Sequence, residues 1–122
     1  MRVLIVESSR DLALLWQRHL ERLGALVETA STQDFAIRRL HVSDFDVIVL
    51  DLVLGEGSAL AVADYASYRR PEARVVFVTN TTFFSDGSIF QHCANACAYL
   101  PSATAPRDLA AMVEHYAHSA AG

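Results

Sequence analysis

The chain alternates between short, almost wholly apolar runs and longer segments with helical spacing. Five runs predict strands, at residues 3–6, 26–29, 47–50, 75–78 and, more weakly, 98–100. The first, third and fourth are nearly continuous in branched apolar residues, which is typical of parallel strands buried on both faces. We therefore expect a sheet that is covered by helices on both sides.

The segments between these runs carry apolar residues three and four positions apart, which predicts amphipathic helices. The expected helices lie over Leu12–Leu23, Phe35–Leu40, Leu60–Ala66 and Leu109–Tyr116, with a weaker one over Asp86–Ala94. Ser8–Asp11 and Ser31–Asp34 fit helix starts, and Gly24 fits a helix end. The order βαβαβαβαβα predicts a doubly wound α/β fold with a five-stranded parallel sheet, as one domain over residues 1–122.

Composition narrows the class of protein. The chain has 122 residues, is 52% hydrophobic and has a formal net charge of −4. It can therefore build a packed core, and its mild acidic balance argues against a nucleic-acid-binding surface. Cys93 and Cys97 are too few for a disulfide scaffold. Arg38–Arg39 and Arg69–Arg70 are interpreted as solvated helix ends. No signal peptide or membrane span is visible, so we expect a cytoplasmic protein that contacts neither nucleic acid nor membrane.

Functional residues in such a sheet lie at the carboxyl ends of the strands. Glu7 and Ser8 follow the first predicted strand, Asp51 ends the third, and Thr79 and Ser102 follow the fourth and fifth. A carboxylate that ends an apolar strand either caps the next loop or takes part in chemistry. Because Glu7 is expected at the same edge as Asp51, we favour chemistry. Two converging carboxylates suit Mg²⁺, which would let Asp51 attack an anionic phosphoryl donor.

Five pieces of the sequence, in the right order and spacing, resemble the receiver domain of bacterial two-component response regulators. They are Val3–Glu7, Asp46–Leu52, Leu54–Leu60, Pro71–Thr79 and Ala96–Leu100. Within them, Gly55 stands where proline is usual. The resemblance covers essentially the whole chain and implies a flavodoxin-like (βα)5 fold. It also implies a signalling module, not an enzyme, that receives a phosphoryl group from a histidine kinase or phosphotransfer protein in a phosphorelay.

The resemblance implies a role for each site residue. Asp51 would accept the phosphoryl group, and the Val53 backbone carbonyl would join Glu7 and Asp51 around Mg²⁺. Thr79 would move its hydroxyl onto the phosphoryl oxygen, and Tyr99 would rotate inward behind it as the aromatic switch. The face formed by the fourth helix, fifth strand and fifth helix would then change for a downstream protein partner. A homodimer through the last helix is a further expectation.

Two positions depart from the family pattern. The family has a second acid after the first strand as the direct metal ligand, where this chain has Ser8, a weak Mg²⁺ ligand that could instead cap the helix. It also has a lysine after the fifth strand, where this chain has Ser102. All ten basic residues are arginines, so no lysine can substitute. We therefore expect a degenerate site with weak Mg²⁺ binding, in which phosphorylation of Asp51 is impaired or conditional.

Two other functions stay open. The chain could be a pseudo-receiver, an interaction module whose surface binds a partner protein regardless of phosphorylation. Less favourably, it could be a phosphatase that uses Asp51 as a nucleophile. Phosphatases of that kind have an Asp-x-Asp motif at the strand end, and they also use a lysine. This chain has Val53 in place of the second acid, and it contains no lysine.

Overall fold

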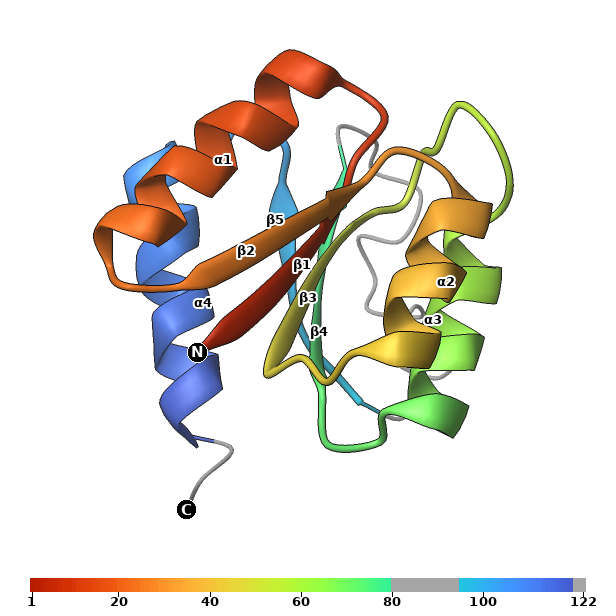
Figure 1. Ribbon diagram of the computed structural model, residues 1–122. Coiled ribbons are helices and arrows are strands. Elements are labelled where there is room, and N and C mark those ends of the chain that lie inside the picture. The colour runs from red at the N-terminus through yellow and green to blue at the C-terminus, as the bar shows by residue number, and fades with distance from the viewer. Residues whose placement is uncertain (80–94, 120–122) are drawn as a thin grey trace.

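A computed structural model describes residues 1–79 and 95–119 and places a five-stranded parallel sheet between two layers of helices (Figure 1). The strands are β1 (Arg2–Val6), β2 (Leu26–Ala30), β3 (Val47–Asp51), β4 (Arg74–Thr79) and β5 (Ala96–Pro101). The helices are α1 (Arg10–Arg22), α2 (Gln33–Val42), α3 (Ala59–Arg69) and α4 (Pro106–Ser119). The strand order, β2-β1-β3-β4-β5, confirms the predicted doubly wound fold. The helix predicted over Asp86–Ala94 lies outside the described residues.

Alternation of side chains along the strands makes both faces of the sheet apolar. Val3 and Ile5 pack with α1 and α4, whereas Leu4 and Val6 pack with α2 and α3. Figure 1 shows the same division, with α1 and α4 over one face of the sheet and α2 and α3 over the other. All five residues of β3 are buried, and so are all of β1 after Arg2. The strand ends are therefore the places where these central strands can present polar groups.

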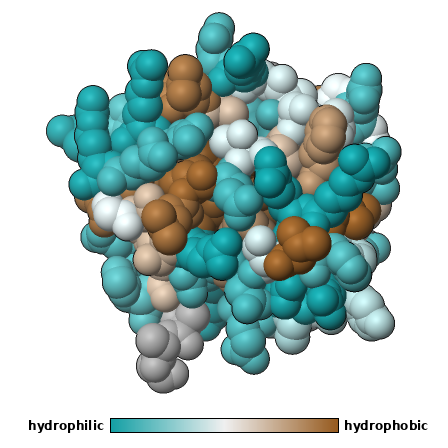
Figure 2. Space-filling model, viewed as in Figure 1, coloured by the Kyte–Doolittle hydropathy of each residue, from teal (hydrophilic) through white to brown (hydrophobic). Residues whose placement is uncertain are grey.

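Helix α1 buries a narrower face than its sequence pattern indicates. Ala13, Trp16 and Leu20 are buried, but Leu15 and the C-cap residue Leu23, which also fit the apolar spacing of the helix predicted over Leu12–Leu23, are 40% and 43% exposed. A helix that lies on a sheet buries only one stripe of its surface, so apolar residues at the margin of that stripe stay in contact with water. The face drawn in Figure 2 is hydrophilic over most of its area, and separate hydrophobic patches interrupt it.

Capping side chains start α1 and α2, and a glycine follows the end of α1, within the segments where the sequence predicts these boundaries. Ser9 is the N-cap of α1, and its hydroxyl accepts a hydrogen bond from the Leu12 N–H at 3.4 Å. Thr32 caps α2 in the same way, with the Phe35 N–H at 3.3 Å. Gly24 follows α1 with a φ of +89°, a left-handed conformation that glycine adopts without strain, which confirms it as the helix end.

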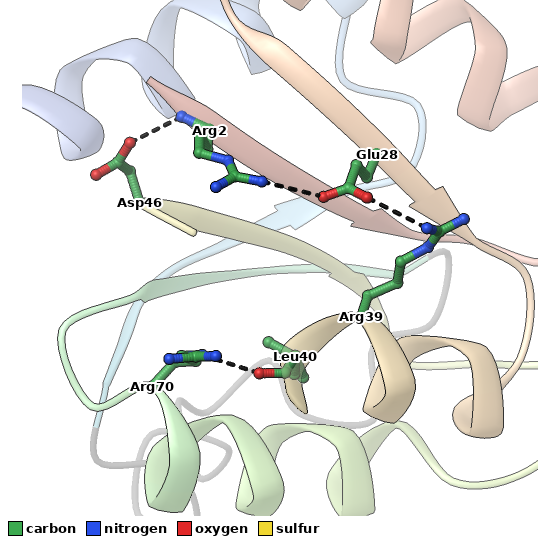
Figure 3. A network of polar contacts seen from close by, with 6 residues as sticks. All are labelled: Arg2, Glu28, Arg39, Leu40, Asp46 and Arg70. Carbon is green, nitrogen blue, oxygen red and sulfur yellow. Dashed lines mark hydrogen bonds and ion pairs between the residues drawn. The ribbon is translucent and has the colours of Figure 1, made fainter. Parts of the chain in front are cut away.

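An arginine that follows α3 holds the end of α2. The Arg70 Nε donates to the Leu40 carbonyl at 2.8 Å, a contact drawn in Figure 3, and Nη2 donates to the His41 carbonyl at 3.1 Å. Nη1 pairs with Asp44 at 2.7 Å, and the side chain is only 18% exposed. The expectation of a solvated helix end is therefore wrong for Arg70, because its guanidinium occupies carbonyls that a helix C-terminus leaves unpaired.

A second polar network lies beside the edge strand β2. Glu28 of β2 pairs with Arg2 of β1 at 3.6 Å and with Arg39 of α2 at 3.2 Å (Figure 3). The backbone N–H of Arg2 also donates to Asp46 at 2.7 Å. Charged side chains on an edge strand disfavour pairing with the strand of another chain. This network therefore ties β1, β2 and α2 together while it keeps the edge polar.

Two further features of the fold are the length of its helices and the place of its cysteines. Among the helices that the structure describes, none is long and apolar enough to cross a membrane. The Cys97 thiol lies beside β4 and donates a weak hydrogen bond to the Val75 carbonyl at 3.5 Å. Cys93 lies outside the described residues.

Arg70→Ala is expected to lower the free energy of unfolding by about 1–3 kcal/mol, because it leaves the Leu40 carbonyl without its donor in a partly buried place. Arg69 donates one exposed hydrogen bond to the His41 carbonyl at 3.0 Å, so Arg69→Ala is the matched control and should cost less than about 0.5 kcal/mol. Urea unfolding measures both variants. Equal losses in the two would contradict the special role of Arg70.

Candidate functional site

Three polar side chains are buried at the edge of the sheet where β1, β3 and β4 end. Glu7, Asp51 and Thr79 are 4%, 9% and 2% exposed, and within residues 1–79 and 95–118 they are the buried polar or charged residues. The parallel register pairs Val6 with Leu50, which places Glu7 level with Asp51. Thr79 ends the neighbouring strand. The structure thus brings the predicted acceptor, the predicted first acid and the predicted switch hydroxyl to one edge.

Glu7 lies against Asp51 and holds a proton near neutral pH. Burial, and then the hydrogen bond to Asp51 and its negative charge, raise the pKa of Glu7 from 4.5 to about 8. The N–H groups of Ser9 and Ser8 act in the opposite direction. With its proton, Glu7 can donate a hydrogen bond to Asp51. Without the proton, its Oε1 still accepts from the Ser9 N–H at 2.9 Å, but the buried Oε2 has no hydrogen-bond partner among the described residues.

The Asp51 carboxylate is anchored by the loop that follows it. Its Oδ1 accepts a hydrogen bond from the Val53 N–H at 2.9 Å, and the Leu52 N–H donates to the Val78 carbonyl at 2.9 Å. Val53 itself is 54% exposed. This residue therefore contributes its backbone, and not its side chain, to the surroundings of Asp51.

The two serines lie at the edge in different ways. Ser8 is exposed in a bend between β1 and α1. The capping role expected of Ser8 is wrong, because Ser9 caps the helix. Ser102 is half-buried, and its N–H donates to the Thr79 carbonyl at 2.9 Å, so the backbone places it beside the end of β4. Tyr99 is half-buried in β5 and packs against the core on the side of α2 and α3.

The edge offers oxygen ligands of few kinds. In the part of the chain that the structure describes, no group of three or more His, Cys, Asp or Glu side chains could hold a metal ion. The groups that could coordinate a metal ion at this edge are therefore the carboxylates of Glu7 and Asp51, nearby hydroxyls and backbone carbonyls. Mg²⁺ binds proteins through one or two carboxylates and keeps several waters, so this sparse donor set fits Mg²⁺ better than a cation that needs many protein ligands.

The sequence does not indicate two features that adjoin the edge. An open hollow of about 590 Å³ lies on the β2 side, and its walls include Glu7, Ser8, Arg10 and Phe35. Gln33, the first residue of α2, contacts the loop that follows β3. Both features join segments that lie far apart in the chain, so no local sequence pattern could have revealed them.

Solved structures of similar fold include receiver domains. A CheY-like response regulator receiver domain protein from Methanospirillum hungatei has a TM-score of 0.89 at 22% identity, covering 98% of this chain and 95% of that chain. A Burkholderia pseudomallei response regulator with a phosphorylated aspartic acid, calcium ion and citrate has a TM-score of 0.83 at 24% identity, covering 97% and 69%. The Thermotoga maritima response regulator TrrA, in complex with Mg²⁺-BeF, has a TM-score of 0.81 at 19% identity, covering 94% and 97%.

At these identities the solved structures show a shared fold, and the family follows from the sequence itself. No curated protein matches the sequence significantly. The sequence pattern of the response regulator receiver domain matches residues 3–114, a span that reaches from β1 into α4 and includes the whole edge described above. The chain therefore belongs to the family of response regulator receiver domains of two-component signalling.

Proposed function

We propose that this receiver domain signals through phosphorylation of Asp51, in a site that lacks part of the usual charge. The observation that carries the proposal is the buried pair of Glu7 and Asp51 at the carboxyl edge of the sheet. Burying two carboxyl groups against each other is unfavourable in a purely structural role, so a site for a cation and a phosphoryl group explains the pair better. Two relatives of the same fold, with a phosphorylated aspartate and with Mg²⁺-BeF, support this.

Mg²⁺ is the proposed cofactor, bound weakly. The carboxylates of Glu7 and Asp51 and the carbonyl of Val53 would hold it, with Ser8 as a weak further ligand and water in the remaining positions. The ion supplies charge neutralisation between Asp51 and an anionic phosphoryl donor. Ser8 adds no negative charge, and Glu7 must lose its proton before it can bind a cation, so both residues lower the affinity.

Asp51 is the nucleophile of the proposed reaction. One of its carboxylate oxygens forms a bond to phosphorus while the bond between phosphorus and the leaving group of the donor breaks, which leaves an aspartyl phosphate. The hydrogen bond from the Val53 N–H, at 2.9 Å, holds the carboxylate in place during the approach. The proposed donor is the phosphohistidine of a histidine kinase or phosphotransfer protein.

Thr79 and Tyr99 are the proposed switch. The Thr79 hydroxyl would donate to the new phosphoryl group, and Tyr99, half-buried in the neighbouring strand, would turn inward. The surface of β5 and α4 would then differ between the two states and bind a downstream protein partner. A homodimer through α4 is a second use of this surface. The predicted helix over residues 86–94, which would complete the surface, lies outside the described residues.

A pseudo-receiver that binds its partner without phosphorylation is the second candidate function. Three features favour it: Glu7 carries a proton near neutral pH, Ser8 replaces an acid, and Ser102 replaces a lysine. Together they leave Asp51 with little help in holding an anionic phosphoryl group. The two functions differ in one measurable property, which is whether Asp51 takes up a phosphoryl group.

Incubation with acetyl phosphate and Mg²⁺ is expected to add one phosphoryl group to only part of the protein, because the missing charges slow the transfer. Intact-mass analysis measures the modified fraction. Asp51→Asn should abolish the modification, whereas Asp64→Asn, an exposed position on α3, should leave it unchanged. An unmodified wild type would favour the pseudo-receiver, and complete modification would overturn the impaired site.

The Glu7 carboxyl group is expected to make folding depend on pH. Because its pKa in the folded protein, about 8, lies above the ordinary 4.5, the folded state binds more protons between these values, and stability falls as the pH rises through this range. Glu7→Gln should remove the fall and be more stable than wild type at pH 8 by about 1–3 kcal/mol. Urea unfolding at several pH values tests this, with Glu72→Gln on the surface as control. A wild-type profile no steeper than that of Glu7→Gln would contradict the shifted pKa.

Restoring the two missing charges is expected to improve the site. Ser102→Lys should raise the rate of phosphorylation about tenfold or more, because the ammonium group can contact the phosphoryl oxygens. Ser8→Asp should lower the Mg²⁺ concentration that gives the half-maximal rate. Mass spectrometry over time measures both effects. Ala103→Lys, at the exposed neighbouring position, is the control, and an equal gain there would show that general charge and not contact is responsible.

A further inference from the structure

The loop that joins β3 to α3, residues 52–58, must hold the Val53 backbone beside Asp51. Its sequence contains Gly55 and Gly57 but no proline, and most of its residues are exposed. Glycine has more conformational freedom than any other residue, so a glycine-containing exposed loop has little rigidity of its own. Contacts from outside the loop must therefore restrict it.

Gln33 supplies such contacts from the start of α2. Its side-chain Oε1 accepts a hydrogen bond from the Ser58 N–H at 2.7 Å. Its own N–H donates to the Glu56 carbonyl at 3.3 Å. Between these residues Gly57 has a φ of +88°, and a Cβ atom at that position would overlap with the Cβ of Gln33. One residue of α2 thus touches three consecutive loop residues, at a distance that only glycine permits.

The other partners of this contact are held as well. Thr32 caps α2 just before Gln33, which fixes the direction of the helix start. Ser58 is the N-cap of α3, and its hydroxyl accepts from the Ala61 N–H at 3.3 Å. On the far side of the loop, a Cβ atom on Gly55 would lie 3.8 Å from the Cβ of Ser8, so the loop passes close to that serine. The contact of Gln33 with the loop therefore joins the capped starts of α2 and α3, and the loop continues into the proposed site.

We propose that Gln33 is a positioning residue for the phosphorylation site and acts through the loop of residues 52–58. This inference rests on the proposed function. By fixing the end of the loop, Gln33 restricts the Val53 carbonyl, a proposed Mg²⁺ ligand, and the Val53 N–H that holds Asp51. The loop contains two glycines and no proline, so the contacts of Gln33 supply stiffness that the loop lacks.

The test follows the rate of phosphorylation by acetyl phosphate as the Mg²⁺ concentration is varied. Gln33→Ala removes the Ser58 partner and should raise the half-saturating Mg²⁺ concentration about three- to tenfold, with the rate at saturating Mg²⁺ close to that of wild type. Gln33→Glu keeps an oxygen acceptor for the Ser58 N–H and should behave like wild type. Gln17→Ala is the matched control, because the half-buried Gln17 of α1 donates its side-chain hydrogen bond to Glu21 of the same helix and not to the loop.

The outcomes separate this inference from the function on which it rests. Wild-type Mg²⁺ dependence in Gln33→Ala would overturn the positioning role while leaving the function of Asp51 intact. So would a Gln33→Glu variant as impaired as Gln33→Ala, because the oxygen acceptor would then not be the important group. A wild-type protein that takes up no phosphoryl group at any Mg²⁺ concentration would overturn both. Beryllofluoride titration in the presence of Mg²⁺ gives a second reading of the same site without chemical turnover.

Discussion

The pairing of β1 with β3 is the constraint on which the rest of the structure depends. Both strands are buried on both faces, and Val6 lies opposite Leu50. Moving one strand by a single residue would turn its buried side chains to the opposite faces of the sheet, so the core allows only one register. The residues at the carboxyl ends, Glu7 and Asp51, are carried to a common buried place by this register. The packing of the apolar core thus determines how close the carboxyl groups of Glu7 and Asp51 lie to each other.

Two buried carboxyl groups this close repel each other when both are ionised, and either of two changes removes the repulsion. A proton on Glu7 converts the pair into a hydrogen-bonded carboxyl and carboxylate, and a divalent cation allows both groups to be ionised. Ser8 is neutral, so it offers a cation no further negative charge beside the two carboxyl groups. Whether Glu7 holds a proton or the site binds a cation therefore sets the charge beside Asp51, and this charge affects the chemistry proposed for Asp51.

The layer formed by α2 and α3 is tied at both ends by single polar side chains. At one end Gln33 of α2 accepts from the backbone of Ser58, which caps α3. At the other end Arg70, which follows α3, donates to the Leu40 carbonyl in α2. Side chains that bridge two helix ends in this way satisfy backbone groups that helix geometry leaves unpaired. The two helices therefore form one unit, and the loop beside Asp51 belongs to it.

Some expectations from the sequence were wrong for reasons that are local to the surface. Ser8 and Ser9 are equally good capping residues, and the choice between them depends on where the chain leaves β1. Leu15 and Leu23 fit the apolar spacing of α1 but lie at the margin of its buried stripe. Sequence periodicity places a residue on a helix, whereas its burial depends on the width of the neighbouring surface.

The sequence by itself determined the sheet, the described helices and the membership of Glu7, Asp51 and Thr79 in one edge. These follow from local patterns, because strands buried on both faces need unbroken apolar runs and parallel strands end at a common side. Only the tertiary structure decided the proton on Glu7, the contact of Gln33 with the loop and the burial of Arg70 against α2. Each depends on atoms from segments that are remote in the chain, where desolvation and hydrogen-bond geometry act on distances that no linear pattern specifies.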